Sequence, residues 1–240
     1  MRVLAINHQL DAGPGVFAES VVAAGGELHQ WRRADTDVPP GDPLGYDAVM
    51  TLGGSMNVDQ EALHPWVAEE RALLAELIER ETPLLGVCLG AQLVAAAAGG
   101  DATRAPSPEV GWYEVEVTPA GRGDPIIGPL APRFDALEWH GYECDLPPEA
   151  TVLAQTPLCT QAFRIGDSAW GIQFHAEVTT ADAGRWIDDY GNDIDAIRVG
   201  IDPDRMRAET LPRMPAWNRL GRDLCDRFLA VVRARTKAGV

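Results

Sequence analysis

A cysteine flanked by two glycines is the first group of residues in this sequence whose spacing suggests chemistry. Gly86-Val87-Cys88-Leu89-Gly90 follows a short apolar run that begins at Pro83, and the Ala- and Leu-rich residues 93–98 come soon after it. This order predicts a strand, an abrupt turn and a helix, the arrangement that exposes a nucleophile on a strained elbow. The positive end of the helix dipole would favour a thiolate at Cys88. Taken alone, the pentapeptide fits a buried structural cysteine between chance glycines equally well.

A histidine and a glutamate two residues apart form a second candidate group. They end the stretch Gly171-Ile172-Gln173-Phe174-His175-Ala176-Glu177, which is of strand length. In an extended chain such residues point to the same side, so the carboxylate of Glu177 can orient the imidazole of His175. A thiolate, an imidazole base and an orienting carboxylate make a nucleophilic triad. Without the cysteine, the pair would indicate only an ordinary surface His and Glu at a strand end.

Two adjacent glycines, Gly53 and Gly54, follow another apolar run, residues 46–52. Glycine lets backbone N–H groups approach a ligand closely. Together with the N–H of Leu89, the residue after the candidate nucleophile, the N–H of Gly54 can hold the oxyanion that forms in acyl transfer. A simple turn from strand to loop explains the glycine pair equally well when it is considered by itself.

Strand and helix patterns alternate in the first hundred residues. We expect strands over residues 3–6, 27–31, 46–52 and 83–87, and helices over residues 16–24 and 65–80. This alternation predicts an open, mostly parallel α/β sheet with helices on both faces. Ligands of such sheets bind at the carboxyl ends of the strands. The glycine pair and the cysteine both lie at those ends, so we expect them to be neighbours in space.

The pattern changes after Gly100. Short strands with turn-rich connections are expected over residues 109–117, 150–155, 161–165 and 169–174, as in an antiparallel section. Residues 180–240 look largely helical, with a turn-rich segment over 209–215 before a final helix. That helix carries an apolar stripe of Leu220, Leu224, Phe228 and Val231. We expect a catalytic domain over residues 1–180 and a helical extension over 181–240 that packs on it.

Composition and charge restrict the classes of function. The sequence has 240 residues, with 20 Lys and Arg against 36 Asp and Glu, which gives a net charge of −16. Such a charge argues against nucleic acid or an anionic membrane as a partner. No apolar run has the length of a membrane span and the N-terminus lacks the features of a signal peptide, so we expect a cytoplasmic protein. The four cysteines are widely spaced without a Cys-x-x-Cys pair, so we expect neither a disulfide framework nor a zinc site.

The three groups together resemble the class I, triad-type glutamine amidotransferases over about residues 3–180. Residues 86–92 resemble the nucleophile motif of that family, and Gly53-Gly54 resembles its oxyanion loop. Phe174-His175-Ala176-Glu177 resembles its His-Pro-Glu motif, with Ala176 in place of the usual proline. The resemblance is strongest to the glutaminase domain of GMP synthetase and to stand-alone proteins similar to it. It implies a flavodoxin-like α/β fold and an enzyme without a cofactor or a metal.

The resemblance also implies a role for each residue of the triad. Cys88 would attack the side-chain amide carbon of glutamine. His175 would give a proton to the departing ammonia and then activate water against the thioester, while Glu177 holds the imidazole. The N–H groups of Gly54 and Leu89 would stabilise both oxyanions.

Substrate recognition is the part of the resemblance where this chain departs from the family. Gly53 and Gln92 would lie beside the substrate, and the segment Trp139-His140-Gly141-Tyr142 would receive its amino-acid end through the backbone. GMP synthetase has a serine before this histidine and an aspartate where Tyr142 stands. We expect a structural role for the His140 side chain, within a turn. The remaining histidines have no partner at a recognisable spacing: His8, His29 and His64.

Three functions remain open on the sequence alone. Residues 180–240 contain no Gly-rich phosphate loop and are too short for a synthetase domain. The first function is therefore a glutaminase whose ammonia goes to a separate synthetase subunit. The second is a stand-alone hydrolase of γ-glutamyl peptides or amides. The third is a catalytically silent binding protein, against which the intact triad speaks.

Overall fold

A computed structural model describes residues 1–36 and 38–238 of the chain. Its strands are β1 (Arg2–Asn7), β2 (Glu27–Arg32), β3 (Ala48–Thr51), β4 (Leu84–Val87), β5 (Asp101–Val117), β6 (Arg133–Asp145), β7 (Thr151–Gln155), β8 (Thr160–Ile165) and β9 (Ala169–Ile172). Its α-helices are α1 (Gly15–Ala23), α2 (Trp66–Glu79), α3 (Leu89–Ala97), α4 (Thr180–Asp188), α5 (Ile194–Val199) and α6 (Pro203–Ala238). Short 3₁₀ helices lie at Pro43–Gly45, Gly121–Gly123, Gly128–Leu130 and Tyr190–Asn192.

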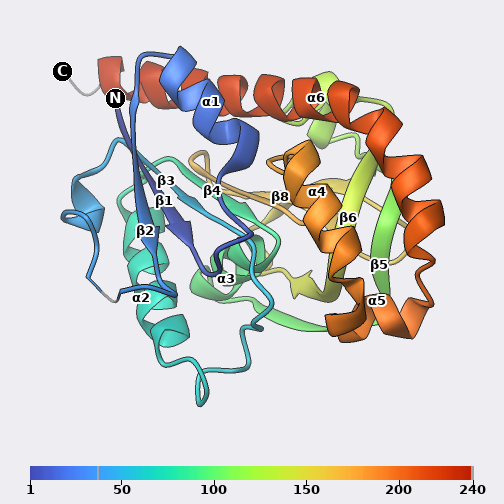
Figure 1. Ribbon diagram of the computed structural model, residues 1–240. Helices are drawn as coiled ribbons and strands as arrows, with labels where there is room; N and C mark the ends of the chain where they lie inside the picture. The colour runs from blue at the N-terminus through green and yellow to red at the C-terminus, as the bar shows by residue number, and fades with distance from the viewer. Residues whose placement is uncertain (37, 239–240) are drawn as a thin grey trace.

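One mixed sheet connects all nine of these strands, in the order β2-β1-β3-β4-β9-β8-β7-β5-β6. From β2 to β9 the neighbours are parallel, as the alternating pattern predicts. β3 and β4 consist wholly of buried residues, as expected for strands covered on both sides. Helices α1 and α6 pack on one face and α2 and α3 on the other (Figure 1). The expected open α/β architecture is therefore confirmed.

The antiparallel half of the sheet was predicted only in part. β6 was missed, and β5 begins at Asp101 and not at residue 109. The segment 139–142 lies within β6, so the expectation of a turn there is wrong. Gly141 and the charged residues of β6 give it no alternating apolar pattern in the sequence. The strand forms because its backbone groups hydrogen-bond to those of β5. Two prolines of β5, Pro106 and Pro108, lie where its register with β6 shifts, between Arg104 and Glu109.

The long last helix also corrects an expectation. Residues 209–215, predicted to be turn-rich, are helical, and α6 contains both Pro212 and Pro215. Proline removes a helical hydrogen bond and bends the helix. Figure 1 shows the resulting bend, from the first part of α6 beside α5 to the last part alongside α1. Burial of Met206, Thr210 and Met214 favours the helix across this region.

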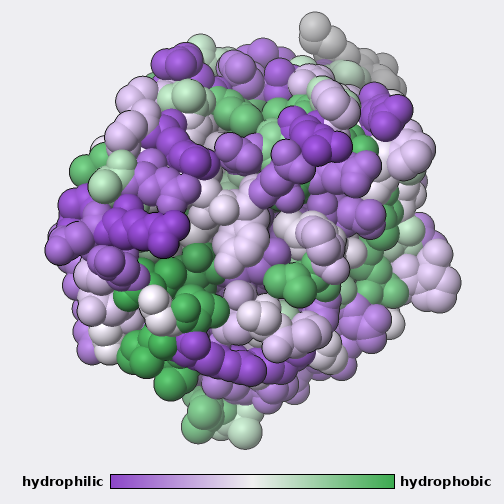
Figure 2. Space-filling view, turned by 90° about the vertical axis from the view of Figure 1, so that its right-hand side faces the viewer, coloured by the Kyte–Doolittle hydropathy of each residue, from purple (hydrophilic) through white to green (hydrophobic). Residues whose placement is uncertain are grey.

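The final turns of α6 bury the stripe that the sequence predicts. Leu224 and Phe228 are fully buried, whereas Leu220 and Val231 are partly buried. Seen from the side of α5 and α6, the surface is mostly hydrophilic, and its apolar side chains form separate groups (Figure 2). Within the described residues no helix combines the length and apolarity needed to cross a membrane.

Candidate active site

Cys88 occupies a strained elbow between β4 and α3. Its backbone has φ 52° and ψ −111°, a conformation that non-glycine residues rarely adopt. The flanking glycines allow two close backbone approaches. A Cβ on Gly86 would lie 2.5 Å from the carbonyl oxygen of Gly90, and one on Gly90 would overlap the carbonyl oxygen of Thr51. The glycines therefore provide space, while the cysteine itself takes the positive φ.

His175 and Glu177 form a buried pair in the connection between β9 and α4. The Nδ1 atom of His175 lies 2.8 Å from Oε1 of Glu177. The predicted extension of the strand through these residues is wrong, because β9 ends at Ile172. The side chains of His175 and Glu177 are in contact nevertheless, because hydrogen bonds fix the backbone that carries them. The N–H of His175 donates to the carbonyl oxygen of Leu137 at 2.9 Å.

Helix α6 holds this connection from the other side. The indole N–H of Trp217 donates to the carbonyl oxygen of His175 at 2.8 Å. The side-chain amide of Asn218 donates to the carbonyl oxygen of Val178 at 2.7 Å. A Cβ on Gly221 would overlap the carbonyl oxygen of Ala176, so the helix backbone lies directly against the connection.

The electrostatics of His175 favour its protonated form. Burial lowers its pKa, but the Glu177 carboxylate and a thiolate at Cys88 outweigh burial, and the pKa lies well above the usual 6.5. The glycine loop lies against the same two groups. A Cβ on Gly53 would be 3.1 Å from Cε1 of His175 and 3.7 Å from Cβ of Cys88. The arrangement suits an imidazolium beside a thiolate nucleophile.

A histidine that the sequence did not single out holds the glycine loop. Nδ1 of His8 lies 2.9 Å from the carbonyl oxygen of Leu52 and 3.2 Å from that of Gly53. Its Nε2 lies 3.1 Å from both carboxylate oxygens of Glu70. Because a trans peptide is planar, the N–H of Gly54 points away from the Gly53 carbonyl, and so away from His8. The side chain of His8 thus fixes the direction of that N–H.

The ion pair between His8 and Glu70 is wholly buried. Burial lowers the pKa of His8, but Glu70 outweighs it, and the net shift is upward. Burial raises the pKa of Glu70, but His8 and the hydroxyl of Thr51 together outweigh burial, so the pKa of Glu70 is lowered. A charged His8 donates from both ring nitrogens. Its indole neighbour, Trp66, stacks on the ring at 4.9 Å between centroids.

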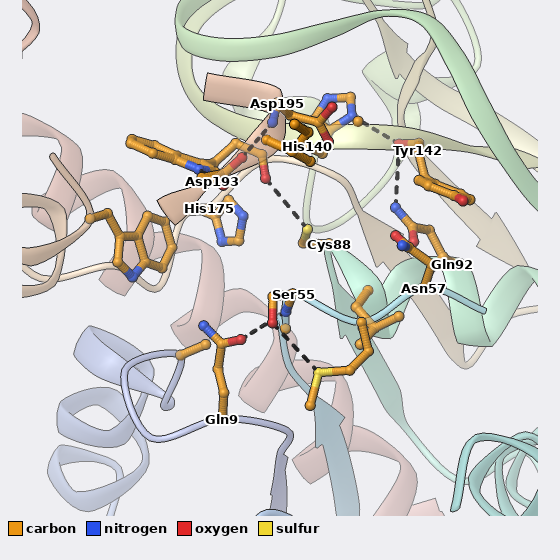
Figure 3. A pocket seen from close by; sticks show the side chains of 18 of the residues that line it. Gln9, Ser55, Asn57, Cys88, Gln92, His140, Tyr142, His175, Asp193 and Asp195 are labelled. Atoms are coloured by element: carbon orange, nitrogen blue, oxygen red, sulfur yellow. Dashed lines mark hydrogen bonds between the residues drawn. The ribbon is translucent and has the colours of Figure 1, made fainter. Parts of the chain in front are cut away.

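A cavity of about 580 Å³ opens at the carboxyl ends of the strands, and Cys88, Gly54, Leu89 and His175 all line it (Figure 3). The predicted substrate residues lie there too. Gln92 donates to the carbonyl oxygen of Tyr142 at 3.3 Å and to Oε1 of Gln173 at 3.2 Å. The cavity therefore brings most of the predicted site residues into one place. Gly53 and Glu177 are not among its lining residues, but both lie against His175.

Comparison with known proteins decides the family. The profile of the family described as "Glutamine amidotransferase class-I" matches residues 18–188. The chain belongs to this family. A glutamine-hydrolyzing GMP synthase subunit of Sulfurisphaera tokodaii is 33% identical over 156 residues, 64% of this chain and 78% of that protein. The glutamine amidotransferase-like protein YfeJ of Salmonella typhimurium is 27% identical over 185 residues, 75% of this chain and 77% of that protein.

Solved structures of amidotransferases share the fold. A glutamine amidotransferase from Thermotoga maritima superposes with a TM-score of 0.84 at 28% identity, over 95% of this chain and 97% of that one. A glutamine amido transferase from Methylobacillus flagellatus gives a TM-score of 0.84 at 22% identity, over 95% and 94% of the two chains. The C-terminal helices thus lie within the matched portion of these folds.

In this amidotransferase, residues from the C-terminal segment complete the cavity wall. The ring of Trp186 packs edge-on against His175 at 4.8 Å. Asp193 accepts a hydrogen bond from the indole of Trp139 at 2.7 Å, and Asp195 pairs with Arg104 at 2.6 Å. No local pattern marks Asp193 and Asp195, because their partners lie more than 40 positions earlier in the chain.

Both ring nitrogens of His140 contact protein groups and are not free to bind a substrate. Its Nε2 lies 3.2 Å from Glu109 and 3.4 Å from Glu138, and its Nδ1 lies 2.9 Å from the carbonyl oxygen of Tyr142. Burial lowers its pKa, but the two carboxylates outweigh burial and raise it to about 10. An imidazole that two carboxylates hold in its protonated form near neutral pH is a poor second base, which agrees with the structural role expected for this side chain.

Proposed function

We propose that this protein hydrolyses the side-chain amide of glutamine through a γ-glutamyl thioester on Cys88, and releases glutamate and ammonia. The observation that carries the proposal is one cavity lined by a cysteine on a strained elbow and by a buried, carboxylate-paired histidine. Membership of the class I amidotransferase family supports the same chemistry.

Each residue has a defined role in the proposed reaction, and His175 acts twice. The Cys88 thiolate attacks the amide carbon, and the C=O electron pair moves to the oxygen, where the N–H groups of Gly54 and Leu89 receive it. His175 then gives its proton to the leaving nitrogen, and the C–N bond breaks as ammonia departs. Water, deprotonated by His175, attacks the thioester and releases glutamate. Glu177 keeps the imidazole oriented throughout.

The first test is covalent labelling with a diazo-ketone analogue of glutamine. The reagent is expected to add its mass to the peptide that contains Cys88, because this thiol alone among the four cysteines lines the cavity. Mass spectrometry after digestion identifies the site, and Cys88→Ala should take up no label. Labelling at Cys144, Cys159 or Cys225 would show that the nucleophile is assigned wrongly.

The substrate is the finer part of the proposal. We favour glutamine, with ammonia passing to a separate synthetase subunit, because of the similarity to glutamine-hydrolyzing GMP synthase subunits. A stand-alone γ-glutamyl hydrolase is the second candidate, because the cavity extends to Asp189, Asn192 and Ile194. Steady-state rates of the pure protein with glutamine and with γ-glutamyl dipeptides separate the two. If the pure protein turns over neither substrate, the result would favour a catalytically silent binding protein or an enzyme that needs a partner subunit.

His8 provides a sharper test of the oxyanion hole. His8→Ala releases the Gly53 carbonyl and lets the Gly54 N–H turn away. Removal of an oxyanion donor costs about 100- to 1,000-fold in kcat, so we expect a loss of about 10- to 100-fold from misorienting one, with KM nearly unchanged. His29→Ala is the matched control, because His29 bonds Tyr46 outside the cavity. Loss confined to KM, or no loss, would contradict this role.

We also propose that residues 1–180 form the catalytic domain and residues 181–240 a helical extension packed on it, in a cytoplasmic protein. Contacts of α6 with the connection between β9 and α4 support the packing. The truncation described in the Discussion tests it.

A further inference from the structure

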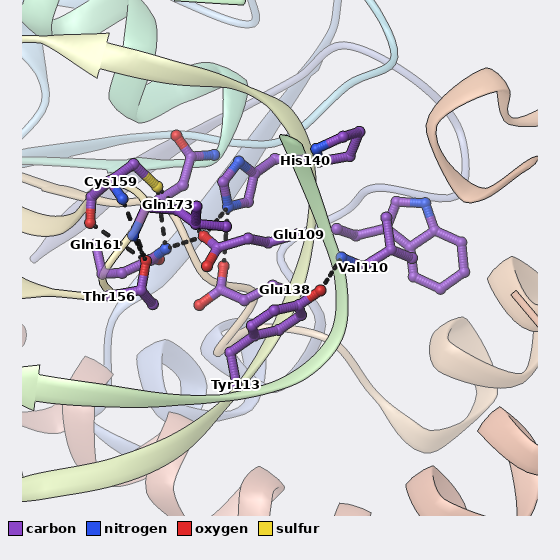
Figure 4. Close-up of polar contacts among 12 residues, drawn as sticks. Glu109, Val110, Tyr113, Glu138, His140, Thr156, Cys159, Gln161 and Gln173 are labelled. Carbon is purple, nitrogen blue, oxygen red and sulfur yellow. Dashed lines mark hydrogen bonds and ion pairs between the residues drawn. The ribbon is translucent and has the colours of Figure 1, made fainter. Parts of the chain in front are cut away.

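A second cluster of reactive side chains lies apart from the proposed triad. Glu109 of β5, Glu138 and His140 of β6, and Cys159 just before β8 meet in the antiparallel half of the sheet (Figure 4). Their exposed fractions are only 1%, 0%, 5% and 7%. The proposed reaction uses none of these four side chains.

The donor atoms have the spacing of metal ligands. Nε2 of His140 lies 3.2 Å from Oε2 of Glu109 and 3.4 Å from Oε2 of Glu138. The Sγ atom of Cys159 lies 3.2 Å from Oε2 of Glu109. Tetrahedral zinc, with bonds of about 2.0–2.3 Å, holds neighbouring ligand atoms about 3.3–3.6 Å apart. The ligand atoms of Glu109, His140 and Cys159 all lie within 4.8 Å of one another, so small adjustments would place these three around one ion. Glu138, 3.4 Å from His140, would turn toward the same ion as the fourth ligand.

Unpaired polar atoms point to a missing partner in this cluster. Within residues 1–36 and 38–238, neither carboxylate oxygen of Glu138 has a hydrogen-bond donor, and neither does Oε1 of Glu109. Two buried carboxylates thus share a single imidazole. A buried charge without adequate partners is unfavourable, and a divalent cation would neutralise this pair.

The surroundings also resemble the outer shell of a metal site. The Nδ1–H of His140 donates to the carbonyl oxygen of Tyr142 at 2.9 Å, so Nε2 faces the cluster. Metal-bound histidines are usually held in this way. The side-chain amide of Gln161 donates to Oε2 of Glu109 at 2.7 Å and so fixes that carboxylate.

We propose that Cys159, His140, Glu109 and Glu138 bind one divalent transition-metal ion of the zinc type. A mixed set of sulfur, nitrogen and oxygen donors suits zinc and cobalt, whereas magnesium and calcium prefer oxygen alone. Binding displaces the protons of the Cys159 thiol and of His140 Nε2 into solvent. The bound ion would tie β6 to its neighbours, and β6 carries the carbonyl of Trp139 that lies 3.9 Å from Sγ of Cys88.

Cobalt binding tests the site without any measurement of activity. Protein carrying Cys88→Ala, stripped with a chelator and titrated with Co²⁺, is expected to show thiolate-to-cobalt charge-transfer bands and tetrahedral d–d bands at one ion per chain. The Cys88→Ala background removes the thiol of the cavity. The added change Cys159→Ser should abolish the charge-transfer bands. Cys225→Ser, a buried cysteine beside Phe17, is the matched control and should keep them.

A second measurement guards against a variant that fails to fold. Glu138→Gln keeps the side-chain shape and is expected to weaken zinc binding, in competition with a chromophoric chelator, by at least about tenfold. Zinc should raise the melting temperature of the Cys88→Ala protein and leave that of Cys88→Ala/Cys159→Ser unchanged. The proposal is wrong if the Cys88→Ala protein gives no such bands, or if they persist after Cys159→Ser.

Discussion

Replacement of His175 by alanine is expected to lower kcat for amide hydrolysis by about 10,000-fold or more. The variant loses both the proton donor for the leaving nitrogen and the base for water, and members of a triad contribute effects of this size. The imidazolium that would stabilise the thiolate at Cys88 is lost as well. Ammonia release measured with a coupled assay gives kcat, and circular dichroism establishes that the variant is folded.

Glu177→Gln should cost less, because the amide perturbs the orientation and charge of His175 but leaves the base in place. His64→Ala serves as a control, because His64 does not line the cavity. If the His175→Ala protein retained activity, His175 would not be the base, and another residue of the cavity would have to be.

Local patterns explain why the parallel half of the fold was predictable. β1, β3 and β4 are short apolar runs that are almost wholly buried, and α2 has an apolar stripe. The glycine-flanked cysteine is also recognisable in the sequence, because Gly86 leaves room for the backbone of Gly90, only four residues later. Predictions of this kind depend on neighbours in the sequence.

Features that depend on distant partners could not be predicted in the same way. His8 gains its role from Glu70, which is 62 residues away, and from two carbonyl groups of a loop after β3. The expectation of no zinc site rests on the lack of closely spaced cysteine pairs, so it does not consider side chains from separate strands, such as those proposed above as ligands. His140 comes close to Glu109 and Cys159 only because the sheet places β6 beside β5 and β8 one strand further along, next to β7. The spacing of these residues in the sequence does not predict this arrangement of strands.

A chain that ends at Pro215 is expected to be insoluble or to melt at a much lower temperature. It would lose the buried side chains of Trp217, Leu224, Phe228, Leu229 and Val232. Burial of each such side chain contributes about 1.5–3 kcal/mol, so together they approach the whole stability of a typical domain, about 5–15 kcal/mol. Thermal unfolding followed by circular dichroism measures the change. A truncated protein with an unchanged melting temperature would show that the extension is independent.

The contact between α6 and the connection from β9 to α4 can also be tested by adding a single methyl group, without removing the helix. By helix propensity alone, glycine to alanine stabilises a helix by up to about 1 kcal/mol. Gly184→Ala in α4 should do so, because its Cβ would meet no described atom within 4 Å. At Gly221 the Cβ would overlap the carbonyl oxygen of Ala176, between the two residues of the proposed catalytic pair. We expect Gly221→Ala to lose about 1–3 kcal/mol of stability and to lower kcat, because α6 or the connection must move. Equal melting temperatures and rates for the two variants would mean that α6 does not position His175 and Glu177.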